Sequence, residues 1–309
     1  MNLQNLTLDE LVSLFITRPE AIVEFYKLCH GVKAGENISL LFNPHRLSTT
    51  NARSSGSVFS SLKNDRQLNG MARLLLYNLE HNVSNPFFAT IQRGYSNIYY
   101  INEFPPIVAR NLILKYTSGI SGDKYILDPC SGWGGRMIGC ASIPNTHYVG
   151  FEPSTQSYEG LLKLGEWLKC LQPTFTYEVY KLPYEESEKV LDVNGVFDFA
   201  LTSPPYYDTE NYSDEETNSL NKFDTFEKWV DGFYMPLILL TTKRIKSESS
   251  FILNIGDRVY PLTDTMQTVC SNNGLFVKRE YDYLSGNGDT KEKFYQISKH
   301  PIISEQFLF

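Results

Sequence analysis

A glycine-rich turn between an apolar strand and a helix constrains the fold of this chain more than any other feature. The predicted strand ends at Asp128, and the run Pro-Cys-Ser-Gly-Trp-Gly follows at residues 129–134. Glycine lets a backbone turn tightly and approach a ligand closely. In an open α/β sheet, ligands bind beyond the carboxyl ends of the strands, and an acidic residue about 20 positions further on can accept hydrogen bonds from ribose hydroxyls. Glu152, at the end of the next predicted strand, has this position.

Strands and helices alternate along residues 101–309, which predicts an α/β domain with a parallel, doubly wound sheet. Apolar runs bounded by turn residues predict a short strand that ends at residues 127–129 and further strands at residues 147–152, 175–180, 197–202, 250–255 and 275–283. Apolar residues at helical spacing predict helices at residues 106–116, 154–171 and 226–246.

Residues 1–100 form a second region, which we predict to be mostly helical. Thr7 and Thr17 are each followed three residues later by glutamate, which is the pattern of a capping box at the start of a helix. Another helix is expected at residues 68–78. The Ser-, Thr- and Asn-rich residues 47–61 are interpreted as a mobile loop.

A second motif follows directly on the predicted strand at residues 197–202. It consists of Ser203, Pro204, Pro205 and Tyr206. Proline fixes φ and has no N–H group, so the carbonyl groups here and the serine hydroxyl can face a ligand as acceptors. The tyrosine ring offers a flat face for stacking. Acceptors beside an aromatic ring suit an exocyclic amine on a planar heterocycle.

Together, Asp-Pro-x-Ser-Gly-x-Gly from Asp128 and Thr-Ser-Pro-Pro-Tyr from Thr202 resemble the motifs of S-adenosylmethionine-dependent DNA amino-methyltransferases. Thr-Ser-Pro-Pro-Tyr is typical of the N4-cytosine enzymes and of one subset of N6-adenine enzymes, so N4-cytosine is slightly favoured. The segment around Phe104 and Pro105 resembles the additional cofactor-binding segment of this family. The resemblance covers about residues 102–300 and implies a Rossmann-like, seven-stranded class I methyltransferase sheet.

The resemblance implies S-adenosylmethionine as the cofactor and a set of residues that hold it. Glu152 would bind the ribose hydroxyls, and Gly132 and Gly134 would line the methionine part. Asp128 would lie near the ammonium group of the methionine or a neighbouring water. The other members of the set are Phe104, Pro105 and Pro129.

The same resemblance implies direct methyl transfer to the amine of a base that has left the duplex, because the amine is out of reach inside the stack. Ser203 and the Pro204 carbonyl would accept hydrogen bonds from the amine. Pro205 belongs to the same catalytic motif, and Tyr206 would stack on the base. Tyr207 is a further stacking candidate. The implied role is site-specific DNA modification, as in restriction–modification.

A locally basic region gives a candidate surface for the nucleic acid. Residues 41–79 carry five cationic side chains against one acidic side chain, Asp65; the cations are Arg46, Arg53, Lys63, Arg66 and Arg73. Phosphate contacts of this kind position a protein on DNA. We predict that Arg46, Arg53 and Arg66 contact the backbone; an ordinary solvated loop is an equally weighted alternative.

Composition excludes several other classes of protein. The net charge of −7 argues against a chain that grips nucleic acid on all sides, although the basic region admits local contact. Five scattered cysteines without a Cys-x-x-Cys pair argue against disulfides and zinc, and isolated histidines argue against any metal. With no apolar run of spanning length and no signal-like start, a cytoplasmic protein without a membrane segment is expected.

Three alternatives stay open at this point. The first alternative is RNA in place of DNA as the substrate. The second is that the chain is a catalytically idle subunit that binds nucleic acid. Cys130 follows a proline, as the nucleophile of C5-cytosine methyltransferases does, but its position in the cofactor loop favours a small packing residue. The oligomeric state is open.

Overall fold

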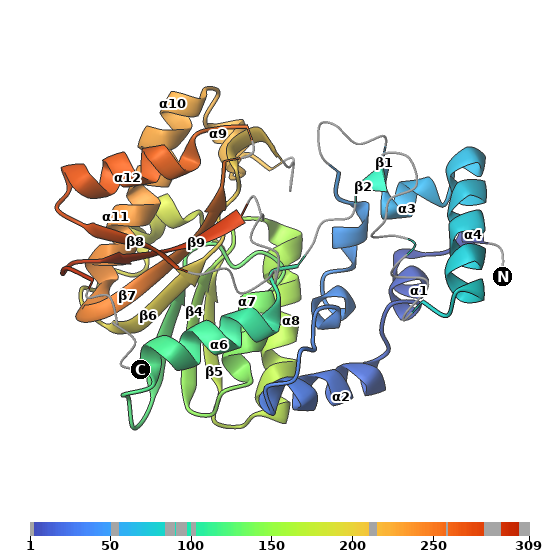
Figure 1. Cartoon of the computed structure of the whole chain (residues 1–309), viewed down its shortest axis with the longest axis horizontal. Coiled ribbons are helices and arrows are strands. Elements are labelled where there is room, and N and C mark those ends of the chain that lie inside the picture. Colours follow the sequence, from blue (N-terminus) through green and yellow to red (C-terminus); the bar gives the residue numbers. More distant parts are fainter. Residues whose placement is uncertain are drawn as a thin grey trace.

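The computed structural model of the chain describes residues 3–50, 56–83, 90, 98–99, 103–209, 215–257, 259–280 and 292–302. Its centre is a seven-stranded sheet with the strand order β5-β4-β3-β6-β7-β9-β8 (Figure 1). The strands are β3 (Lys124–Asp128), β4 (Thr146–Phe151), β5 (Thr176–Tyr180), β6 (Phe197–Thr202), β7 (Ile245–Gly256), β8 (Phe276–Glu280) and β9 (Glu292–Ser298).

The strands from β5 to β7 run parallel, and β9 pairs antiparallel with both β7 and β8. This is the arrangement of a Rossmann-like class I methyltransferase sheet, which confirms the predicted fold class. The predicted parallel pairing is confirmed from β5 to β7 and is wrong for β9, a strand that was not predicted. The sequence of β9, Glu-Lys-Phe-Tyr-Gln-Ile-Ser, mixes charged and aromatic residues and has no apolar run like that of β6.

Helices cover both faces of the sheet because successive strand residues point to opposite sides. Ile126 belongs to one buried cluster and its neighbour Leu127 to the other. The first cluster includes side chains of α6 (Pro106–Thr117), α7 (Gly135–Ala141) and α8 (Thr155–Leu171). The second includes side chains of η4 (Tyr184–Lys189), α10 (Phe226–Trp229), η6 (Val230–Tyr234), α11 (Met235–Arg244) and α12 (Leu262–Asn272).

The N-terminal region lies beside the sheet and shares its core (Figure 1). Helices α1 (Leu8–Ser13) and α2 (Arg18–Cys29) begin at complete capping boxes, which confirms both predicted starts. Leu11 and Phe25 are buried in the same cluster as α6 to α8. The other elements are η1 (Leu3–Asn5), η2 (Ile38–Leu41), η3 (Pro44–Ser48), α3 (Val58–Ser61), α4 (Asp65–Glu80) and the short strands β1 (Gly56–Ser57) and β2 (Ile98–Tyr99).

Two predicted segments differ from the structure. The single helix expected at residues 226–246 is α10 and α11 joined by a π-helical turn, η6, and the chain enters β7 at Ile245. The loop expected at residues 47–61 contains a short helix, α3, whose first turn is capped by the Ser57 side chain. The segments after β6 are η5 (Tyr207–Thr209) and α9 (Ser219–Lys222). None of the described helices is long and apolar enough to cross a membrane.

Candidate active site

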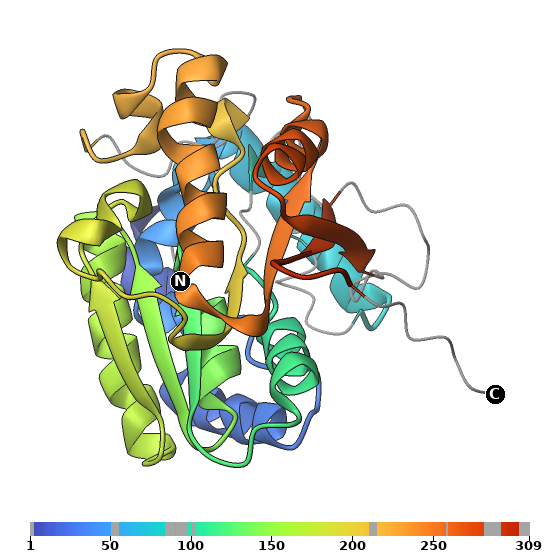
Figure 2. The ribbon, with the colours of Figure 1, turned by 90° about the vertical axis from the view of Figure 1, so that its left-hand side faces the viewer.

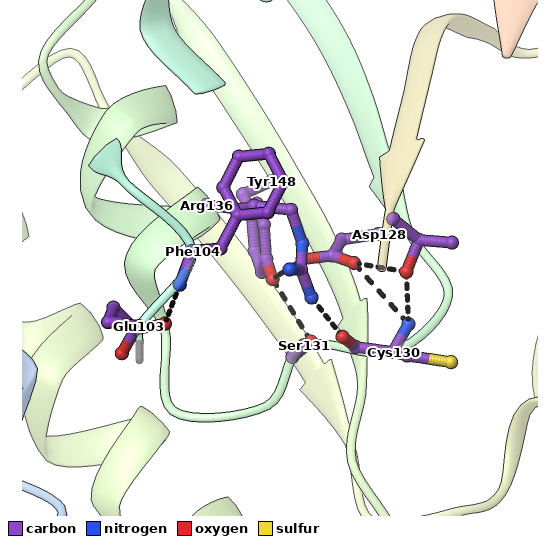
Figure 3. Close-up of polar contacts among 8 residues, drawn as sticks. Glu103, Phe104, Asp128, Cys130, Ser131, Arg136 and Tyr148 are labelled. Atoms are coloured by element: carbon purple, nitrogen blue, oxygen red, sulfur yellow. Dashed lines mark hydrogen bonds and ion pairs between the residues drawn. The ribbon is translucent and has the colours of Figure 1, made fainter. Parts of the chain in front are cut away.

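Asp128 ends β3 and is the centre of a buried hydrogen-bond network (Figure 3). Its side chain is 1% exposed. Oδ2 accepts from Arg136 Nε at 2.9 Å and from the Tyr148 hydroxyl at 2.7 Å, and Oδ1 accepts from Thr202 Oγ1 at 3.0 Å. Since protein donors occupy both oxygens, this carboxylate shapes the loop after β3. Its predicted place near the ammonium group of the methionine or a neighbouring water stays a prediction.

The glycines of the loop have conformations that other residues rarely adopt. Gly132 and Gly134 have φ values of +58° and +102°. A Cβ at Gly132 would meet nothing within 4 Å, so its backbone borders open space. A Cβ at Gly134 would lie 2.4 Å from Leu164 Cδ2, so this glycine lets α7 pack against α8. The first position is thus suited to a ligand and the second to helix packing. Pro129, between Asp128 and the loop, is buried.

Glu152 follows β4 directly and lies on the same side of the loop as Gly132. Oε1 accepts from the Ser154 backbone amide at 2.9 Å, and the Gly132 amide also donates to the carboxylate. Burial raises the pKa of Glu152 to about 8, although both amides act to lower it. A neutral polar ligand that donates hydrogen bonds would stabilise the charged form of this group.

Phe104 and Pro105 lie where the chain enters α6, next to the start of α7. The Arg136 guanidinium lies 5.1 Å from the centre of the Phe104 ring. A Cβ at Gly135 would lie 2.2 Å from the Phe104 carbonyl oxygen, so the two helix starts are in close contact. Glu103 Oε1 accepts from the Phe104 amide at 3.0 Å and fixes this approach. The predicted additional segment therefore does pack against the glycine-rich loop.

Arg46 has a different place from the predicted one. Its side chain is 1% exposed, and Nη1 pairs with Glu103 Oε2 at 3.1 Å. The same Glu103 oxygen accepts from Ser39 Oγ at 2.7 Å. The guanidinium lies 5.9 Å from the centre of the Trp133 ring, behind the loop. The prediction that Arg46 contacts a phosphate backbone is wrong, because a buried, ion-paired side chain supports the loop from inside.

The other predicted phosphate contacts have separate outcomes. Arg66 is exposed in the first turn of α4, so its contact with nucleic acid stays a prediction. Arg53 falls in residues 51–55, outside the part of the chain that the structure describes.

The second motif lies at the carboxyl end of β6, next to β3 in the sheet. Ser203, Pro205 and Tyr206 are partly exposed, whereas Pro204 is buried. Thr202 precedes the motif and, besides its bond to Asp128, accepts from the Cys130 amide at 3.1 Å. The two sequence motifs are therefore joined through one threonine hydroxyl, a link that the sequence analysis missed.

Tyr207 has a left-handed backbone with φ of +53°, which is uncommon for a bulky residue. This turn directs its ring into a group of aromatic side chains. The Tyr207 ring lies edge-on to Tyr260 at 5.0 Å and to Phe226 at 5.7 Å between ring centres. The predicted role of Tyr207 in stacking on the substrate stays a prediction.

Cys130 has the environment of an unreactive thiol. Burial and the charge of Asp128 raise the pKa of Cys130 well above its ordinary value. The thiolate is the nucleophilic form of cysteine, so a raised pKa disfavours attack. This supports the interpretation of Cys130 as a packing residue.

Two further contacts near Glu152 had no counterpart in the sequence analysis. Both oxygens of Glu215 accept from Thr155, at the start of α8: Oε1 from the backbone amide and Oε2 from the hydroxyl, each at 2.8 Å. Thus the chain beyond the Ser-Pro-Pro-Tyr motif returns to the end of β4. Among the described residues, no group of histidine, cysteine and acidic side chains is arranged to hold a metal ion.

No family model and no curated protein matches the chain. Among solved structures, an rRNA methylase from Streptococcus thermophilus is similar over 64% of this chain and 98% of its own, with 11% identity and a TM-score of 0.41. TrmN from Thermus thermophilus is similar over 64% of this chain and 49% of its own, with 11% identity and a TM-score of 0.43. A TehB-like SAM-dependent methyltransferase from Corynebacterium glutamicum covers 74% of this chain and 99% of its own, with 12% identity and a TM-score of 0.38. These likenesses are distant, and neither an activity nor a substrate follows from them.

Proposed function

We propose that this protein is an S-adenosylmethionine-dependent methyltransferase that modifies the exocyclic amine of a base in a nucleic acid. The observation that carries the proposal is the meeting of two motifs at one edge of the sheet. Glu152 follows β4 and Ser203 follows β6, with β3 between these strands. Strands lie about 4.8 Å apart, so the two strand ends are about 10 Å apart. A cofactor and a planar acceptor fit side by side over this distance.

The residues at the end of β4 and after β3 fit the cofactor. The open space beside the Gly132 backbone leaves room for a ligand, and the adjacent Glu152 carboxylate has further lone pairs for ribose hydroxyls. Phe104 and Pro105 would lie beside the methionine end. Asp128 would act indirectly, by holding the loop through Thr202, Arg136 and Tyr148. When bound, S-adenosylmethionine supplies a methyl group on a positively charged sulfur.

The Ser-Pro-Pro-Tyr motif would orient the acceptor amine. The Ser203 hydroxyl and the Pro204 carbonyl would each accept a hydrogen bond from the amine, which would turn the nitrogen lone pair out of conjugation with the ring. Pro205 keeps the motif rigid, and the Tyr206 ring would stack on the base. Positioning of this kind supplies much of the rate of a transfer between two bound groups. The amine nitrogen would form its bond to the methyl carbon as the bond from that carbon to the sulfonium sulfur breaks, leaving a neutral thioether, and the nitrogen would release its proton to water.

The identity of the polymer and of the base is a further part of the proposal. The motif resemblance favours DNA and N4-cytosine, with N6-adenine next and restriction–modification as the implied context. RNA is the alternative polymer; the burial of Arg46 removes one predicted phosphate contact, and RNA and DNA offer that contact alike. A duplex substrate would have to flip its base, whereas a single strand would not.

Cofactor binding and methyl transfer, measured together, test the proposal against the idle-subunit alternative. Calorimetric titration with S-adenosylmethionine should show binding to the wild type and to Ser203→Ala, and weaker binding to Glu152→Ala. Transfer of a labelled methyl group to total RNA or DNA should occur with the wild type and be reduced in Ser203→Ala. Cofactor binding without transfer to either polymer would favour the idle subunit, and no binding at all would refute the proposal.

A further inference from the structure

Four aromatic side chains pack together beside the catalytic motif. We call Tyr207, Phe226, Trp229 and Tyr260 the aromatic cluster. Phe226 and Tyr260 are stacked, with ring centres 4.6 Å apart and planes 19° apart. Trp229 is fully buried and stacks on Phe226 at 6.0 Å. The other three side chains are partly exposed. Trp229 therefore packs beneath rings that reach the surface.

The position of the cluster places it on the acceptor side of the site. Tyr207 follows Tyr206 directly, and Tyr260 lies four residues beyond Gly256, the end of β7. β7 is the neighbour of β6 on the side away from β3 and β4, where the cofactor residues lie. Figure 2 shows the helices after β6, in gold and orange, at the upper end of the sheet. A substrate that reaches Ser203 from this side must pass the cluster.

The charges around the aromatic cluster favour contact with a base over contact with the phosphate backbone. Burial, together with the charges of Asp208, Asp224 and Glu227, raises the pKa of the Tyr207 hydroxyl. Asp224 is paired with Lys228 at 2.8 Å, which leaves the charges of Asp208 and Glu227 to repel a phosphate, so this surface is unsuited to the sugar–phosphate backbone. A base is neutral and has flat faces that stack on aromatic rings in a largely sequence-independent way.

We propose that Tyr260, backed by the Phe226 ring, binds by stacking the base next to the target base in the nucleic acid. The proposal rests on the proposed function, because it assumes that the target amine is held at Ser203 and Pro204. The strained left-handed turn at Tyr207 has a role in this arrangement: it sets the Tyr207 ring edge-on against both stacked rings and keeps them in place.

Direct binding of short, fluorescently labelled single-stranded RNA and DNA tests this role by fluorescence anisotropy. Tyr260→Leu and Phe226→Leu keep an apolar side chain and remove the ring. Tyr260→Leu should lower the affinity about 5- to 150-fold, which corresponds to about 1–3 kcal/mol for one lost stack. Phe226→Leu should lower it by a smaller factor, because it removes only the ring that backs Tyr260. Tyr260→Phe keeps the ring and should bind nearly as the wild type does. The loss should be the same at low and high salt, because stacking involves no phosphate charge.

Tyr125 provides a matched control at the opposite edge of the sheet. It is 39% exposed and stacks on His147 with ring centres 4.6 Å apart, but it lies near the amino end of β3. Tyr125→Leu should leave the affinity for oligonucleotides unchanged. Thermal unfolding of each variant shows whether a loss of affinity comes from misfolding. Comparison of Tyr260→Leu with Tyr260→Phe then shows whether the aromatic ring itself contributes to the affinity.

The outcomes separate this proposal from the proposed function. Wild-type affinity in folded Tyr260→Leu and Phe226→Leu would overturn the stacking role, even if methyl transfer is observed. Absence of oligonucleotide binding by the wild type would overturn it as well. A ring-dependent loss of affinity in a protein that transfers no methyl group to RNA or DNA would show that the cluster stacks on a base, but it would refute the proposed catalytic function and with it the assignment of that base as the neighbour of a target.

Discussion

Thr202 Oγ1 donates a hydrogen bond to Asp128 Oδ1 at 3.0 Å and accepts one from the Cys130 amide at 3.1 Å. The threonine is the first residue of Thr-Ser-Pro-Pro-Tyr, and the aspartate is the first residue of the glycine-rich motif. One buried hydroxyl therefore fixes the end of β6 against the loop after β3. A shift at either strand end would be transmitted to the other, so this contact sets the relative position of the two halves of the candidate site.

Removal of that hydroxyl should destabilise the protein measurably. Thr202→Val keeps the shape of the side chain but removes the hydroxyl partner of Asp128 Oδ1 and of the Cys130 amide, which then retain only their longer contact with each other at 3.3 Å. We expect a loss of roughly 1–3 kcal/mol in the free energy of unfolding. Urea unfolding measures this loss, and Thr202→Ser, which retains the hydroxyl, is the matched control. Equal stability of Thr202→Val and the wild type would show that the contact contributes nothing.

The affinity for S-adenosylmethionine should rise with pH through Glu152. Its pKa is raised to about 8 in the free protein, so below pH 8 the carboxyl group is mostly protonated. Ribose hydroxyls would donate to the charged form, so binding should release a proton. Between pH 6 and 8 the affinity should then increase, by up to about 100-fold, and level off above.

Calorimetry in two buffers with different ionisation enthalpies measures the proton release directly. Glu152→Gln is the matched variant, because it keeps the shape of the side chain and cannot ionise. It should bind more weakly above pH 8 and show little dependence on pH. A wild-type affinity that is flat from pH 6 to 9 would contradict the assignment of Glu152.

Two arginines in the predicted basic region should behave in opposite ways. Arg46→Ala leaves the Glu103 carboxylate buried without its cation, and loss of one partner of such a pair costs about 3–5 kcal/mol. Arg66→Ala removes an exposed side chain, so it should leave thermal stability unchanged and flatten the salt dependence of nucleic-acid binding. Melting curves and salt titrations of both variants check this. A stable Arg46→Ala protein would refute the supporting role of Arg46.

Local sequence signals predicted the parts of the fold that depend on near neighbours. The capping boxes at Thr7 and Thr17 lie within single turns, and both helices begin there. Asp128 is the last residue of β3 and Glu152 directly follows β4, as the strand-end motifs predicted. These strand ends located the candidate site before any tertiary contact was known.

The roles of several residues depended on distant partners and were not predictable from the sequence. Arg46 pairs with a glutamate 57 positions away, and Thr202 with an aspartate 74 positions away. In the sequence alone, an arginine in a Ser- and Asn-rich segment cannot be distinguished from an arginine exposed to solvent, because its acidic partner lies far along the chain. Similarly, the π-helical turn at residues 230–234 interrupts an apolar pattern that suits one continuous helix.

The two loop glycines should respond differently to alanine. Both have positive φ, which costs about 1–2 kcal/mol for any other residue. Gly134→Ala also brings its Cβ against Leu164, a collision that costs about a further 1–3 kcal/mol. Gly132→Ala places a methyl group in open space, so this variant should be more stable than Gly134→Ala. It should bind S-adenosylmethionine more weakly than the wild type. Chemical unfolding and calorimetry separate the two effects, and equal stability of both variants would contradict the packing role of Gly134.

The most direct test of the central claim is nucleoside mass spectrometry after the protein has been incubated with S-adenosylmethionine and RNA or DNA. The proposed geometry predicts N4-methylcytosine or N6-methyladenine in one of the two polymers with the wild type, and a strong reduction of the same nucleoside with Ser203→Ala and Tyr206→Ala. Methylation at a ring carbon, or full activity in both variants, would contradict amine transfer at the Ser-Pro-Pro-Tyr motif.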